Sequence, residues 1–219
     1  MTPRTIRFVL LTSLVLAACN TAPYYKALEK VGIEKRELLV RRVEGARDAQ
    51  KDAQEQFRDA LEKYKALVGY QGGDLESMYN KLSSEYDASE SKAKEVRERI
   101  TKVEQVAQSL FEEWQREIGQ YSNAQFKRES ERELATTRQR TDQVVKAMKR
   151  SAATMDPVLT KLHDQVLFLK HNLNARALGS LSGTAKSLQL EVDGLIKEMQ
   201  GSIAEADKFI QEMRTAPKQ

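Results

Sequence analysis

A strict repeat of apolar residues between positions 75 and 121 restricts the fold of this chain more than any other feature. The repeat alternates spacings of four and three residues, and its positions are Leu75, Tyr79, Leu82, Tyr86, Ser89, Ala93, Val96, Ile100, Val103, Ala107, Leu110, Trp114, Glu117 and Tyr121. Twelve of the fourteen positions are apolar, whereas a chain that is 40% hydrophobic would place about six there by chance. Sustained over this length, a mean spacing of 3.5 residues predicts a left-handed coiled coil.

A similar seam precedes it, in a first helix predicted to begin near residue 26 and end near residue 68. Its positions are Leu39, Val43, Ala46, Gln50, Ala53, Phe57, Ala60, Tyr64 and Leu67. Gln50 is the polar exception, and one polar residue in a seam can fix register at some cost in stability. The glycines at 69, 72 and 73 then end the helix, and Asp74 can cap the next one. Two helices of similar length joined by a tight turn predict an antiparallel hairpin.

The rest of the chain predicts one long kinked helix and a final helix. Gly119 ends the second helix, and residues 122–125 (SNAQ) resemble a capping box for the third. The third seam runs through Leu134, Thr137, Thr141, Val144, Met148, Ser151, Met155, Val158 and Leu162, then slips in phase to Val166, Leu169, Leu173 and Ala177. Asp156-Pro157 predicts a kink without reversal. We expect Gly179 and Gly183 to flank the last turn, and a final helix from about Ala185 to Met213.

Composition agrees with elongated helices. The chain is 31% charged and 6% aromatic, with 10 Gly and 4 Pro in 219 residues. The expected fold is therefore all-α, an elongated antiparallel coiled-coil bundle of three to four long helices over residues 26–215. The formal net charge is +4 and falls by two when Arg4 and Arg7 are removed with the segment described next. This balance excludes a nucleic-acid partner, which would require a clustered basic face.

Residues 1–18 have the features of a signal peptide that is cleaved on export. Arg4 and Arg7 precede an apolar run at 8–17, which is too short for a permanent membrane span. Residues 16–19 (LAAC) resemble the lipobox of bacterial lipoproteins, and Cys19 is the one cysteine of the chain. That resemblance implies that a diacylglyceryl group is attached to the Cys19 thiol and that the new amine is acylated. Two or three acyl chains make a stable membrane anchor. The alternative is an ordinary signal peptide that happens to contain a cysteine.

The residues after Cys19 bear on location and geometry. In enterobacterial lipoproteins an aspartate after the cysteine retains the protein in the inner membrane, so Asn20 favours the periplasmic face of the outer membrane. Residues 19–25 form the lipidated cysteine and a short tether, in which residues 20–23 reach at most about 14 Å. Tyr24 and Tyr25 suit either the lipid headgroup region or a hydrophobic staple at the helix start. We expect the helical body to begin at the bilayer surface.

One candidate contact site surrounds the two histidines. It comprises His163, Asp164, Lys170, His171, Asn172, Asn174 and Arg176. Polar contacts between helices are the main interpretation, and contact with a partner or ligand is the alternative. The chain has no HExxH motif or additional cysteine that could complete a metal site with these histidines. We therefore expect no metal, no cofactor and no small-molecule substrate.

A second candidate site is basic and lies in the third helix. It comprises Lys127, Arg128, Arg132, Arg138, Lys146, Lys149 and Arg150. Several acidic residues are interspersed, so a solvated coiled-coil face is the main interpretation. Contact with anionic lipid or lipopolysaccharide is the alternative. The serines lie in helical patterns without a nucleophile elbow, and Gly72-Gly73 lacks the GK[ST] of a phosphate loop, so we expect no enzyme.

Four segments together resemble a known family. They are residues 35–43 (KRELLVRRV), 72–75 (GGDL), 111–114 (FEEW) and 165–175 (QVLFLKHNLNA). They are similar to a proteobacterial family of envelope lipoproteins catalogued as domain of unknown function 2959, and the LFLKHNLNA segment is the most specific part. The resemblance implies an exported helical protein, supplies no catalytic residue, and favours a role beyond packing for the segment around His171.

Two functions follow from these features. The leading hypothesis is a lipid-anchored helical module that holds or spaces an envelope protein or a second copy of itself. The alternative is a BAR-like module that binds or shapes membranes by lying along anionic lipid. The two differ in whether the helical body stands on the membrane or lies along it.

Overall fold

The computed structural model describes residues 34–70 and 72–215, which contain five helices and no strand. The helices are α2 (Lys35–Val68), α3 (Leu75–Ile118), α4 (Ala124–Ala153), α5 (Met155–His171) and α6 (Ala175–Thr215). The predicted signal peptide, Cys19, the tyrosine pair and the predicted helix start near residue 26 therefore lie outside the described residues.

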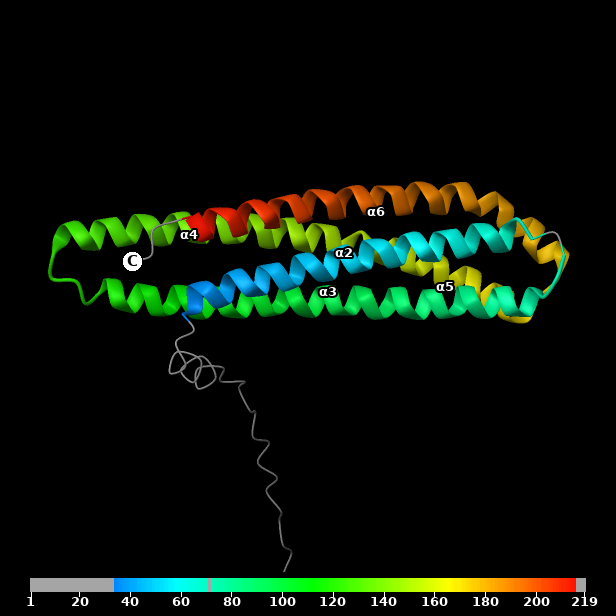
Figure 1. Cartoon of the computed structure of the whole chain (residues 1–219), viewed down its shortest axis with the longest axis horizontal. Helices are drawn as coiled ribbons and strands as arrows, with labels where there is room; N and C mark the ends of the chain where they lie inside the picture. Colours follow the sequence, from blue (N-terminus) through cyan, green and yellow to red (C-terminus); the bar gives the residue numbers. More distant parts are fainter. Residues whose placement is uncertain (1–33, 71, 216–219) are drawn as a thin grey trace, which may run out of the picture. The chain divides into compact units, whose positions relative to one another are not determined.

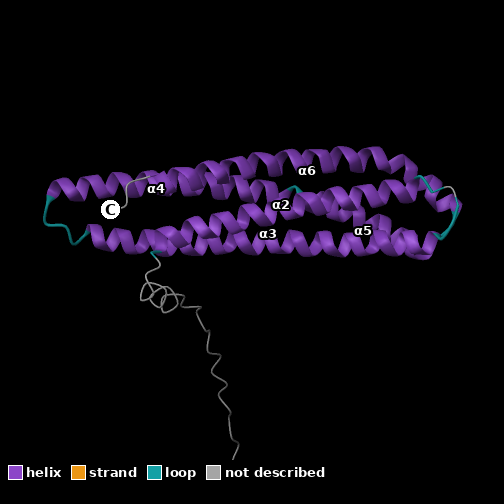
Figure 2. Ribbon diagram, in the orientation of Figure 1, coloured by secondary structure: helices purple, strands orange, loops and turns teal. Residues whose placement is uncertain are grey.

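The helices form the expected all-α bundle of antiparallel helices (Figures 1 and 2). α2 packs against α3 and α6, and the α4–α5 pair packs against the same two neighbours. α4 and α5 follow one another in the same direction, so five helices occupy the four positions of a four-helix bundle.

The predicted seams form the core. Every seam position of α2 has a relative exposure of 0%, including Gln50. All nine positions from Leu134 to Leu162 are buried, and so are the α3 positions from Leu82 to Leu110, with Tyr86 partly buried. The α3 repeat leaves the core at its end, where residues 117 and 121 are exposed.

Local chemistry sets the two turns that α3 makes with its neighbours. Gly72 and Gly73 have φ angles of 139° and 129°, in the left-handed region that favours glycine. Asp74 caps α3 as predicted, since its carboxylate accepts the Ser77 N–H at 2.9 Å. At the other end, Asn123 caps α4 by accepting the N–H groups of Gln125 and Phe126 at 2.8 and 3.3 Å. The cap is therefore Asn123, and the predicted capping box beginning at Ser122 is wrong by one residue.

The predicted position of the last turn is wrong. The chain reverses at residues 172–174, and α6 begins at Ala175 instead of about Ala185. Gly179 and Gly183 lie inside α6, because a helical glycine costs only about 1 kcal/mol relative to alanine. Asn174 offsets this cost by accepting the Ala177 N–H at 3.0 Å.

The predicted phase slip of the third seam to Val166, Leu169, Leu173 and Ala177 is confirmed only in part. Val166 and Leu169 are buried in α5, but Leu173 is 38% exposed because it lies in the turn. Ala177 is buried as a residue of α6. The predicted interruption without reversal is found at Thr154, between α4 and α5. Pro157 lies in the first turn of α5, where a backbone N–H has no partner within the helix, so the proline costs no hydrogen bond.

Replacement of Gln50 by an apolar residue is expected to stabilise the bundle. Its side-chain Oε1 accepts a hydrogen bond from Ser202 Oγ at 3.0 Å, but its Nε2 has no partner among the described residues. Because a buried unpaired amide is unfavourable, we expect Gln50→Leu to raise the free energy of unfolding by about 1 kcal/mol. Urea unfolding followed by circular dichroism measures this change. A loss of similar size would show that the amide stabilises the bundle.

Candidate functional site

Different turns and helix ends lie at the two ends of the bundle. One end of the bundle is formed by the α3–α4 turn, which projects beyond the start of α2 and the end of α6; we name this side of the bundle the N-terminal end (Figure 1). There, Lys35 Nζ pairs with Glu113 of α3 at 2.7 Å, and Arg140 of α4 pairs with Glu212 of α6 at 3.2 Å. The α2–α3 and α5–α6 turns lie at the opposite end, which we name the far end.

The histidine set lies on α5 and around the far end. Its members are mostly exposed, and Asn172 is half-buried. His163 contacts Tyr86 of α3, with ring centroids 5.5 Å apart, and its Nδ1 lies 3.9 Å from Asp164. Asn172 Nδ2 donates to the Phe168 carbonyl at 2.9 Å, and Asn174 caps α6. Asn172 therefore caps the end of α5 and Asn174 caps the start of α6, while the charged side chains at residues 170 and 176 are exposed.

An exposed apolar cluster accompanies this set, and sequence reasoning did not identify it. Leu167, Phe168 and Leu173 are 49%, 40% and 38% exposed. The signal was present, because Leu167 and Phe168 fall between the seam positions Val166 and Leu169 and so cannot share the core with them. We name these three residues the far-end apolar cluster.

The described residues contain no group of three or more His, Cys, Asp or Glu side chains suited to hold a metal ion. The two histidines both lie on α5. Among the described helices, none is long and apolar enough to cross a membrane.

The basic set of α4 does not behave as one patch. Lys149 pairs with Glu104 of α3 at 2.6 Å, and Arg150 pairs with Glu198 of α6 at 3.2 Å. The Arg138 guanidinium lies over the Phe111 ring, 5.3 Å from its centroid. The remaining four members are exposed and form no ion pair with a described residue; they are Lys127, Arg128, Arg132 and Lys146.

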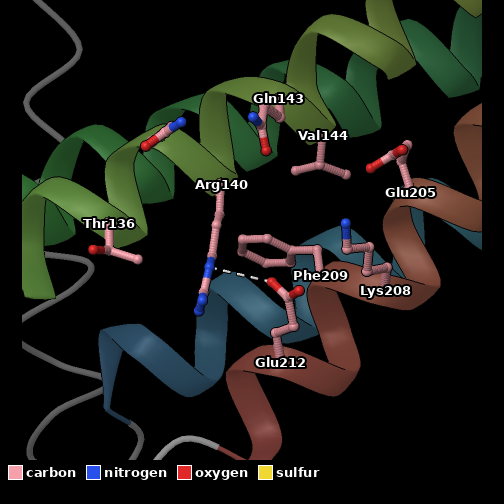
Figure 3. A pocket seen from close by; sticks show the side chains of 9 residues that line it. Thr136, Arg140, Gln143, Val144, Glu205, Lys208, Phe209 and Glu212 are labelled. Atoms are coloured by element: carbon pink, nitrogen blue, oxygen red, sulfur yellow. Dashed lines mark ion pairs between the residues drawn. The ribbon is translucent and has the colours of Figure 1, made fainter.

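Two open grooves flank α4, and of their lining residues only Arg138 belongs to a predicted site. The groove between α4 and α6 has a volume of about 290 Å³ (Figure 3). It is lined by Thr136, Gln139, Arg140, Gln143, Val144, Glu205, Lys208, Phe209 and Glu212. The ion pair between Arg140 and Glu212 joins α4 to α6 beside the Phe209 ring. The second groove, between α3 and α4, has a volume of about 520 Å³ and contains the contact between Phe111 and Arg138. Both are open to solvent and lined by charges of either sign, so neither has the enclosed character of a small-molecule site.

Comparison with models of known protein families shows to which family this chain belongs. The model of a family described as protein of unknown function, DUF2959, matches residues 24–213. The chain belongs to the DUF2959 family. The match includes the far-end apolar cluster, the α4 grooves and nearly all of the five helices, and it confirms the predicted membership of this family of unknown function. No curated protein and no solved structure matches this DUF2959 protein.

A buried tyrosine joins α2 to α6 near the far end of the DUF2959 bundle. Tyr64 is 0% exposed, and its hydroxyl donates to the Leu181 carbonyl at 3.0 Å and lies 2.6 Å from Thr184 Oγ1. Burial raises the pKa of Tyr64 above its usual value of 10.0, and the hydrogen bond to Thr184 opposes that rise. The phenol therefore stays protonated in the fold at a pH where an unfolded chain has lost its proton.

This pKa shift predicts loss of stability at alkaline pH. Above about pH 10 the unfolded chain releases the Tyr64 proton while the fold retains it, so raising the pH favours unfolding until the pH passes the raised pKa. We expect Tyr64→Phe to lower the free energy of unfolding at pH 8 by about 1 kcal/mol and to make its decline above pH 10 shallower. Urea unfolding at several pH values tests this, with the exposed Tyr121→Phe as control. An equal decline in wild type and Tyr64→Phe would contradict the assignment.

Proposed function

We propose that this DUF2959 protein is a lipoprotein of the outer membrane, held at the periplasmic face through Cys19. In this proposal its helical bundle is a structural module without catalytic activity. The bundle holds or spaces an envelope partner, which binds at the far end.

The observation that carries the proposal is the burial of the seams over most of the length of the bundle. α3 has 44 residues, so a straight helix of this length extends about 66 Å. Because the seams of α2, α3 and α4–α5 are buried over most of their lengths, the two ends are held apart by continuously packed helices. A stiff body of this length suits a spacer.

The sequence around Cys19 supports anchoring at the N-terminal end. The LAAC motif at residues 16–19 suits lipid attachment, and the chain enters the bundle at Lys35. Even fully extended, residues 20–33 reach no more than about 48 Å. An anchor at Cys19 would therefore hold the start of α2 within about 48 Å of the bilayer.

The far-end apolar cluster supports the position of the partner site. Leu167, Phe168 and Leu173 are exposed together with charged neighbours at residues 164, 170 and 176. An apolar centre with a polar rim is the usual composition of a surface that binds another protein. Partners of this kind include a second copy of the chain.

The partner proposal predicts a site-specific crosslink in cells. A photoreactive phenylalanine analogue at Phe168 should give a discrete crosslinked product, identified by mass spectrometry. The matched control is the same analogue at Leu190 of α6, which is 64% exposed but lies outside the cluster. Adding Cys19→Ser should reduce the product, because the chain would no longer be held at the membrane. Absence of a product at residue 168, or the same products at both positions, would contradict the proposal.

One observation favours a second function, in which the bundle lies along the membrane. Lys127, Arg128, Arg132 and Lys146 are exposed on α4 without an ion pair to a described residue. This arrangement would suit contact with anionic lipid headgroups.

The second function predicts salt-sensitive flotation of the unlipidated mature protein with anionic liposomes. The double substitution Arg128→Glu and Lys146→Glu should then weaken binding at low salt by at least about tenfold, since each basic residue near an anionic surface contributes about 1 kcal/mol. Lys63→Glu, on the exposed surface of α2, is the control. If the unlipidated protein does not float at low salt, the second function is excluded.

A further inference from the structure

We propose that the α3–α4 turn is a second membrane contact, in which Tyr121 and Phe126 enter the headgroup region of a bilayer and hold the bundle end-on. This inference rests on the proposed lipid anchor at Cys19. It differs from the second function above, because the contact is made by aromatic rings at one end and not by basic side chains along α4.

The exposure of the turn is the first observation. Every residue from 119 to 129 is exposed, whereas the preceding Ile118 is buried. Tyr121 and Phe126 are 44% and 55% exposed, and Phe126 is the most exposed aromatic side chain among the described residues. Large apolar side chains exposed together at the end of a bundle are typical of an interaction surface.

The position of Phe126 is fixed by the cap of α4. Asn123 Oδ1 accepts the Phe126 N–H at 3.3 Å and the Gln125 N–H at 2.8 Å, so the first turn of α4 is held in a defined conformation. Trp114 and Ser130 join α3 and α4 behind it, with an Nε1–Oγ distance of 2.8 Å. The two rings are therefore presented on a rigid hairpin.

The location of the hairpin selects a bilayer as its partner. The α3–α4 turn lies on the same side of the bundle as the start of α2, which follows Cys19 in the chain (Figure 1), and Lys35 at that start pairs with Glu113 of α3. The turn extends beyond the first residue of α2 and the last described residue of α6. A contact that is weak by itself becomes effective when a tether holds it near its target.

The charges near the two rings indicate the kind of contact. Lys127, Arg128 and Arg132 are matched by acidic side chains at residues 129, 131 and 133. Because these charges balance, attraction to anionic lipid contributes little. Tyrosine and phenylalanine at a bilayer surface act instead through their rings, which favour the boundary between headgroups and acyl chains. We therefore expect contact with zwitterionic lipid that does not depend on salt.

The test uses the full mature sequence with a histidine tag in place of Cys19, tethered to phosphatidylcholine vesicles through nickel-chelating lipid. An environment-sensitive fluorophore is attached to Ser122→Cys, beside Tyr121, or to the matched control Ser84→Cys, on α3 toward the far end. Both serines are exposed. We expect a blue shift and quenching by spin-labelled lipid at residue 122, equal at low and high salt, and neither change at residue 84.

Substitutions then identify the side chains responsible. Tyr121→Ser and Phe126→Ser should each lower the equilibrium constant for contact by roughly tenfold, whereas Leu190→Ser should leave it unchanged. No change at residue 122 would overturn the proposal. So would a response at residue 84, which would show that the far end meets the membrane, or loss of the response in high salt, which would assign contact to the basic residues of α4.

The outcome is separable from that of the proposed anchor, because the chelating tether replaces the native lipid. Mass spectrometry of the protein purified from bacterial membranes tests lipid attachment at Cys19 independently. An unmodified Cys19 would overturn the proposed anchoring while leaving the vesicle result valid as a property of the turn.

Discussion

The continuous burial of seams with four–three spacing is the constraint on which the rest of the structure depends. With 6% aromatic residues, the chain cannot build a thick core, so it buries a narrow line of side chains along each helix. Small residues such as Ala46, Ala53 and Ala60 allow close approach of neighbouring helices, and larger side chains such as Phe57 fill the space between them. Replacing the buried side chains along any long section of a seam would therefore loosen the packing there, and the two ends of the bundle would no longer be held at a fixed distance.

Polar contacts within this narrow core select which helices pair and in which register. Gln50 and Ser202 connect α2 to α6 in the middle of their contact, and Tyr64 connects the same helices nearer the far end. Trp114 and Ser130 connect α3 to α4. Apolar seams alone permit slippage by a heptad, because each heptad resembles the next. Hydrogen bonds at specific levels of the bundle make the alternative registers unfavourable.

Sequence periodicity predicted the helices and their core faces well, because a 3.5-residue repeat over many turns has few other solutions. Every predicted seam position of α2 is buried, and Asp74 caps α3 as expected. The last turn was misplaced because glycine was taken as a helix terminator, whereas Asn174 and buried Leu178 and Leu181 hold Gly179 inside α6. The exposed cluster at Leu167, Phe168 and Leu173 was missed, because exposure depends on where the neighbouring helices end, and no single repeat encodes that.

The central claim is that the bundle stands end-on, with its N-terminal end at the membrane and the far-end apolar cluster away from it. The proposed lipid anchor, the aromatic α3–α4 turn and the proposed partner surface then have separate places along one stiff body. The most direct measurement is the height of a fluorophore at residue 84 above vesicles that carry the lipidated protein, obtained by energy transfer to acceptors in the bilayer. The account predicts a height of roughly 50 Å, from the 1.5 Å rise of each helical residue between 84 and the α3–α4 turn. A height below about 20 Å, close to the thickness of two packed helices, would show that the bundle lies along the membrane and would contradict the account.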